Sequence, residues 1–109
     1  MNSVTSMAAS GMLAAERRLE IAARNVANAS AALPQSAPDK VVAAFNSLRA
    51  DQVETSGGGT AVNAVPTTEP VDLAHEAVEL TIARYTLAAN ANVMRAAAKM
   101  QKSVLDISA

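Results

Sequence analysis

The sequence predicts a mostly α fold, in which long N- and C-terminal helices form an antiparallel, coiled-coil-like pair joined by a short connector. Residues 71–107 contain neither proline nor glycine and are rich in good helix formers. Residues 1–30 repeat apolar side chains at helical spacing. Residues 31–70 hold all four prolines and a run of three glycines, which is typical of loops and turns. With 109 residues, the chain is expected to form a single domain.

The first segment, Asn2 to Ser30, has the pattern of an amphipathic helix with one packing seam. Its seam residues alternate at intervals of four and three, as in a heptad repeat, and charged residues occupy the other faces. The seam consists of Ala8, Met12, Ala15, Leu19, Ala22, Val26 and Ala29. Gly11 lies inside this segment, where glycine is less favourable than alanine by roughly 1 kcal/mol. Three explanations stay open: the helix starts later, another backbone packs closely there, or the glycine is tolerated near a frayed end.

The middle of the chain predicts a connector with a turn at its centre. Residues 31–40 hold two prolines and little periodicity, which indicates a loop. Lys40 to Val53 fits one helical face and an extended strand about equally well. Gly57 to Gly59 requires a turn or a flexible link, and Thr60 to Val65 alternates like a strand before Pro66 and Pro70 close the segment. We favour a short β-hairpin across the glycines; the alternative is a disordered, exposed linker.

The last segment, residues 71–107, would form a helix roughly 50 Å long, more than a chain this small needs to enclose a core. Its apolar residues follow two stripes, each at intervals of three and four. One stripe contains Ile82, Ala89, Val93, Ala97, Met100, Val104 and Ile107. The other contains Leu73, Ala77, Leu80, Leu87, Ala91, Met94, Ala98 and Leu105. Two stripes predict two buried faces, so further helices, from this chain or from copies of it, are expected to cover the second.

Composition and charge exclude several classes of function. The formal net charge is −1 and the basic residues are scattered among acidic ones, so no nucleic-acid partner is expected. Cysteine is absent, which excludes disulfides and cysteine-bound metals. The first ten residues lack the basic start and apolar run of a cleaved signal peptide, and charges interrupt every window long enough to span a bilayer. We therefore expect no cleaved leader and no membrane insertion.

We expect no catalytic, cofactor-binding or metal-binding residues. His75 is the only histidine, and no cysteine is present to complete a metal site with it, so a capping or surface role is expected. Asp72, Glu76 and Glu79 fall in the first turns of the second predicted helix, where carboxylates interact favourably with the helix dipole. That role explains them better than an acid–base pair does.

Three polar or aromatic residues in the last segment invite a structural interpretation. Asn90 and Asn92 are poor helix formers, and an asparagine that faces a seam can fix the register between helices. Exposure to solvent is the alternative for both. Tyr85 is expected to be a packing residue with its hydroxyl at an edge.

Taken together, the two end segments resemble the bacterial flagellar axial proteins, the subunits of the rod and hook. The first segment contains an asparagine-rich motif of that family, and the second contains its acidic motif and a later tyrosine–asparagine–valine pattern in the family order. The matching residues are Asn25-Val26-Ala27-Asn28-Ala29, then Val71-Asp72-Leu73 with Glu76, and finally Tyr85 with Asn90 to Val93. The short connector is similar to that of the shortest members, the proximal-rod type or a rod-like relative.

The resemblance implies a terminal-helix domain that forms the inner core of a helical tube. It also implies export through the flagellar type III apparatus without a cleaved leader, a place in the periplasmic rod of the basal body, and a structural role without catalysis or cofactors. The implied partners are other rod subunits, further copies of the chain and the export apparatus. The alternative is a small helical adaptor or chaperone of the export apparatus, which would bind its substrates through the exposed stripe.

Helix packing and assembly are assigned to side chains on both predicted helices. The assigned residues are Met12, Leu19, Val26, Asn28, Leu73, Leu80, Ile82, Tyr85, Leu87, Val93, Met94, Met100 and Val104. A repeating contact between different surfaces of successive copies builds a helical filament instead of a closed dimer.

Overall fold

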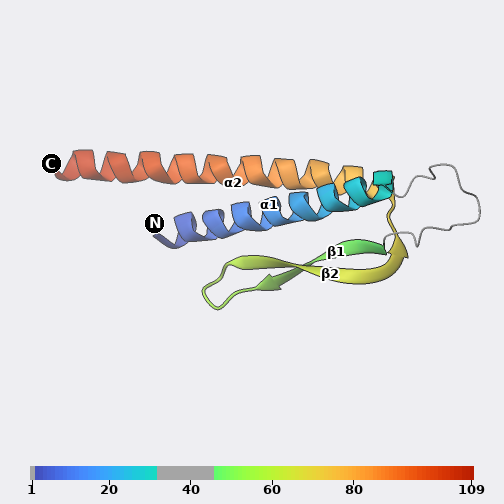
Figure 1. Ribbon diagram of the computed structural model, residues 1–109. Coiled ribbons are helices and arrows are strands. Elements are labelled where there is room, and N and C mark those ends of the chain that lie inside the picture. The colour runs from blue at the N-terminus through green and yellow to red at the C-terminus, as the bar shows by residue number, and fades with distance from the viewer. Residues whose placement is uncertain (1, 32–45) are drawn as a thin grey trace, which may run out of the picture.

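The computed structural model describes residues 2–31 and 46–109. In chain order it contains α1 (Asn2–Ala31), β1 (Asn46–Glu54), β2 (Thr60–Pro70) and α2 (Leu73–Ser108). Figure 1 shows the two helices side by side and antiparallel, with the β-hairpin running along α1. The predicted fold class, a mostly helical chain with paired terminal helices and a short hairpin between them, is confirmed.

The α1 helix follows the predicted seam closely. Ala8, Ala15 and Ala22 are buried, and the larger seam residues between them are half-buried. Gly11 lies well inside the helix, so a later helix start and a frayed end are both wrong as explanations. A Cβ atom at Gly11 would lie 2.7 Å from Nδ2 of Asn90 on α2. The close neighbour is therefore a side chain and not a backbone, and glycine provides the space for it.

The α2 helix starts later than predicted because Asp72 caps it from outside. The Asp72 carboxylate accepts hydrogen bonds from the backbone N–H groups of Ala74 at 3.0 Å and His75 at 3.4 Å. Side-chain capping of this kind satisfies amide groups that have no partner within the helix. At 1.5 Å per residue, the 36 residues of α2 span about 54 Å and the 30 residues of α1 about 45 Å. The C-terminal end of α2 therefore extends past the start of α1, as Figure 1 shows.

The predicted hairpin across the glycines is confirmed. β1 and β2 pair antiparallel from Glu54 opposite Thr60 onwards, and Gly58 takes the left-handed conformation (φ 83°) that closes the turn. The disordered-linker alternative is wrong for residues 46–70. For the segment that fitted both a helix and a strand, residues 46–53 form a strand; residues 40–45 lie outside the described part of the chain, as does most of the loop predicted over 31–40.

β2 extends beyond the alternating residues 60–65, since it continues through Pro66 and ends at Pro70. Pro66 lies opposite Leu48, whose N–H and C=O both bond to the side chain of Asn25 and not to β2. The Leu48–Pro66 pair is thus a non-hydrogen-bonded position of the ladder, where the missing N–H of proline removes no bond between the strands.

The hairpin packs on a face of α1 different from the seam that meets α2. A small apolar cluster of Ala14, Ile21 and Val62 lies at its centre, with side chains of β1 and β2 around it. At the turn, the backbone N–H of Thr60 donates to Oγ of Ser10 at 2.9 Å. The hairpin is therefore held along α1 at both its middle and its tip.

Candidate functional site

Asn25 joins three elements of the fold through one buried side chain. It is 1% exposed, and its Nδ2 donates to the backbone oxygen of Leu48 at 2.8 Å and to Oε1 of Glu76 at 2.9 Å. Its Oδ1 accepts from the backbone N–H of Leu48 at 2.8 Å. All the hydrogen-bonding groups of this amide are used, so α1, β1 and α2 are fixed in one register.

Glu76 lies in the first turn of α2, as predicted, but it has a further role. It is 4% exposed and directed toward α1, where it is a buried partner of Asn25. The sequence interpretation missed both residues as packing positions. A signal was present for Asn25, since it follows buried Ile21 and Ala22 at intervals of four and three residues. Asn28, which was assigned to packing, is half-buried.

The seam of α2 combines residues from both predicted stripes. Its buried and half-buried members again alternate at intervals of four and three, as Glu76, Leu80, Ala83, Leu87, Asn90, Met94 and Ala97. Leu80, Leu87 and Met94, which were assigned to packing, are half-buried on this seam. Asn90 lies on the seam against Gly11, whereas Asn92 is exposed and its Oδ1 accepts from Nη1 of Arg95 at 3.1 Å. The register explanation thus fits Asn90, and the solvent alternative fits Asn92.

Most of the first predicted stripe of α2 lies on the surface, although its member Ala97 is buried in the seam. Its large exposed side chains form one line with Val78 and Tyr85, which the predicted stripe did not include. We call this line the α2 stripe, and its members are Val78, Ile82, Tyr85, Val93, Met100, Val104 and Ile107. The exposed fractions of these side chains range from 43% at Val93 to 83% at Ile107, and Tyr85 is 75% exposed. Leu73, also assigned to packing, is exposed at the start of the helix. No element within residues 2–31 and 46–109 covers this stripe.

The last turns of α2 have no helix beside them in Figure 1. Every residue from Ala98 to Ala109 is exposed. This overhang carries Met100 and Val104 of the α2 stripe together with Leu105. A free helix of this length is marginal in water, so tertiary contact is the usual source of its stability.

A furrow runs between β1 and α2, with α1 as its floor. Two hollows of about 200 and 270 Å³ follow it, and both are lined by Arg18. Arg18 spans the furrow: Nη2 donates to Oε1 of Gln52 at 2.8 Å, and Nη1 lies 3.4 Å from Oε2 of Glu79. A larger, more polar hollow of about 670 Å³ continues the furrow at the start of α2.

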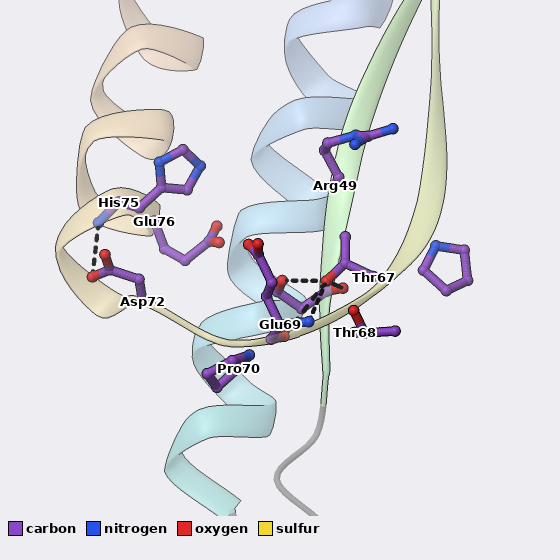
Figure 2. A pocket seen from close by; sticks show the side chains of 10 residues that line it. Arg49, Thr67, Thr68, Glu69, Pro70, Asp72, His75 and Glu76 are labelled. Carbon is purple, nitrogen blue, oxygen red and sulfur yellow. Dashed lines mark hydrogen bonds between the residues drawn. The ribbon is translucent and has the colours of Figure 1, made fainter.

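Figure 2 shows this polar hollow from close by. His75 and Glu76 extend from α2, Asp72 comes from the link before that helix, Glu69 from the end of β2 and Arg49 from β1. Asp72 is occupied as a helix cap and Glu76 as the partner of Asn25. His75 is exposed near the helix start, as expected.

The described residues form neither a metal-ligand cluster nor a membrane-spanning helix. Residues 2–31 and 46–109 contain no group of three or more histidine, cysteine or acidic side chains placed to hold a metal ion. No helix within the same ranges has the length and apolar character needed to cross a membrane.

Comparison with known proteins adds no family to this description. Neither the family models nor the curated proteins contain a match to the sequence. The flagellar resemblance therefore stays a prediction.

Proposed function

We propose that this chain is a structural subunit of the bacterial flagellar rod, which assembles by helix packing with copies of itself and with other axial subunits. The observation that carries the proposal is the α2 stripe, a line of large apolar side chains that the described part of the chain leaves uncovered. Exposed apolar surfaces of this extent mark interaction sites.

The shape of the helix pair favours a repeating assembly. Helices joined through small seam residues such as Ala15, Ala22 and Ala83 can approach closely over a long contact. Under this proposal a neighbouring copy covers the α2 stripe with a different surface. Contacts of this heterologous kind repeat into filaments.

The junction of Asn25 with Glu76 supports the family resemblance from within the fold. Asn25 begins the asparagine motif and Glu76 is the acid of the second motif, and the two side chains are hydrogen bonded. The residues that carry the resemblance thus have a shared structural reason to occur together. Under this proposal the chain resides in the periplasmic rod and reaches it through the flagellar export apparatus.

The second candidate is an adaptor or chaperone of the export apparatus. It is favoured by the same stripe, because that surface is open in a single chain and could receive a helix of an export substrate. The two candidates differ in location, since a rod subunit copurifies with basal bodies and an adaptor stays in the cytosol.

The deciding experiment combines location with stripe variants. Basal bodies are isolated from cells that express the wild type, Met100→Asp, Val104→Asp or the control Ala88→Asp, which lies exposed and outside the α2 stripe. The wild type and Ala88→Asp are expected in the basal bodies, and the two stripe variants are expected to be absent from them. Cytosolic wild-type protein would reject the rod proposal and favour the adaptor.

A further inference from the structure

The outer edge of β1 is the part of the hairpin that faces the furrow. At Leu48 the backbone N–H and C=O both point away from β2 and bond to the side-chain amide of Asn25. A primary amide presents the same acceptor and donor as a peptide unit. Asn25 therefore occupies this edge in the way a third strand would.

The same orientation recurs at Ala50 and Gln52. In an antiparallel ladder the backbone groups of alternate residues point outward, so positions 50 and 52 share the outward direction of Leu48. A hydrogen bond at the turn supports this assignment of inward and outward residues. The N–H of Thr55 donates inward to the oxygen of Gly59 at 2.9 Å, so the backbone groups of the odd-numbered residues of β1 point toward β2 and those of the even-numbered ones point outward. No hydrogen bond from another element described here reaches the outward groups of Ala50 and Gln52.

The opposite edge of the hairpin is less suited to pairing. The outward positions of β2 include Pro66, which has no N–H to donate. Proline on an edge strand is a common means of preventing further pairing. The two edges thus differ, because a proline hinders further strand pairing on the β2 edge and no proline lies on the β1 edge.

The surroundings of the β1 edge fit an extended chain. The hollow beside Ala50 has Ile21 and Ala22 on its floor and His75 and Glu79 on the facing wall. Arg49 lines it as well and takes part in no salt bridge within the described ranges. A peptide here would place a small apolar side chain toward the floor and a carboxylate beside Arg49.

We infer that β1 accepts an extended peptide segment of another protein chain, which adds as a third strand in the furrow and pairs with the outward groups of Ala50 and Gln52. Main-chain pairing at a sheet edge is an established mode of peptide recognition. The entering strand would replace the 3.4 Å contact of Arg18 with Glu79, which crosses the furrow between the two hollows. This inference goes beyond the proposed function and holds for a rod subunit and an adaptor alike.

The test uses the synthetic peptide acetyl-Val-Ala-Glu-Ala-Val-amide as a probe, added to the full chain and followed by amide hydrogen exchange in NMR spectra. The amide protons of Ala50 and Gln52 are expected to exchange more slowly with the probe bound. Those of Arg49 and Asp51, which already point toward β2, are expected to change little. A probe N-methylated at alternate amides has lost its donors and should not bind.

A pair of proline variants provides the matched control. Ala50→Pro removes one outward N–H of β1, and Ala64→Pro removes the corresponding N–H on the β2 edge, since these residues are opposite each other. Losing the edge bonds is expected to weaken probe binding at least about tenfold in Ala50→Pro and to leave it unchanged in Ala64→Pro. If Ala50→Pro fails to fold, the N-methylated probe supplies the same test.

Three results would overturn the inference: no binding of the probe at millimolar concentration, equal binding of the N-methylated probe, or equal binding by folded Ala50→Pro. Val104→Asp separates this test from the proposed function, because Val104 lies on the overhang, away from the furrow. That variant is expected to bind the probe normally even though it is excluded from basal bodies.

Discussion

The side-chain amide of Asn25 donates to the carboxylate of Glu76 across 2.9 Å, which joins two residues that are 51 positions apart in the chain. The same amide also bonds to both backbone groups of Leu48. One side chain therefore sets the relative position of α1, α2 and the hairpin. Its replacement is expected to affect the whole fold.

Asn25→Ala is expected to lower the free energy of unfolding by about 2–4 kcal/mol, because it leaves a buried carboxylate and two backbone groups without partners. Urea denaturation followed by circular dichroism measures this change. Asn92→Ala serves as the control, since Asn92 is exposed and its side chain accepts a hydrogen bond from Arg95 on the same helix. A loss for Asn25→Ala as small as that of the control would show that the junction contributes little to stability.

The contact between Gly11 and Asn90 predicts that Gly11→Ala changes the stability of the protein in opposite directions with and without the Asn90 side chain. In the wild-type background, Gly11→Ala is expected to destabilise, because its Cβ would lie 2.7 Å from Nδ2 of an Asn90 side chain that is held by a bond to Thr86. In an Asn90→Ala background the clash is gone, and the helix propensity of alanine should stabilise the protein by up to about 1 kcal/mol. Thermal unfolding of the four variants gives the coupling energy. Equal effects in both backgrounds would contradict the close contact.

The hairpin turn depends on the left-handed conformation of Gly58. Gly58→Ala is expected to destabilise the protein by about 1 kcal/mol, since φ is 83° at this position. Gly57→Ala is the matched control: a Cβ there meets nothing within 4 Å and φ is not positive. It should change stability by no more than about 0.5 kcal/mol. Denaturant midpoints of the two variants provide the comparison, and equal midpoints would argue against a strained turn.

Seam and stripe variants should separate folding from assembly. Leu19→Asp and Leu87→Asp place a charge in the helix interface and are expected to lower stability by about 2–4 kcal/mol as well as to prevent assembly. Val104→Asp changes an exposed position, so stability should stay within about 0.5 kcal/mol while assembly is lost. Melting curves and sedimentation of the purified chains measure the two properties. A large loss of stability in Val104→Asp would mean that the α2 stripe is already covered in the monomer.

Much of the fold follows from patterns that act over short distances. The alternation of Ala8, Ala15 and Ala22 predicts one face of α1, and the glycine run predicts the turn, because both depend on local backbone geometry. It was less predictable which face of α2 would pack against α1. Alanines occur on several faces of this helix, and they pack or remain exposed at similar cost.

The polar part of the site depends on long-range contacts that the pattern does not contain. The sequence pattern explains Glu76 only as a first-turn carboxylate that interacts favourably with the helix dipole. Its burial depends on Asn25, which comes from the opposite end of the chain. The passage of β2 through Pro66 depends on the strand register, which places Pro66 opposite Leu48 at a position without hydrogen bonds between the strands.

The excess length of α2 gives the molecule a direction. At one end of the described residues, α2 is a single helix without a neighbour and carries Met100 and Val104. At the other end, Asp72 caps α2 beside the hairpin. Copies arranged head to tail would form a column whose first and last members present unlike faces. Such a column could be extended, anchored or sealed differently at its two ends.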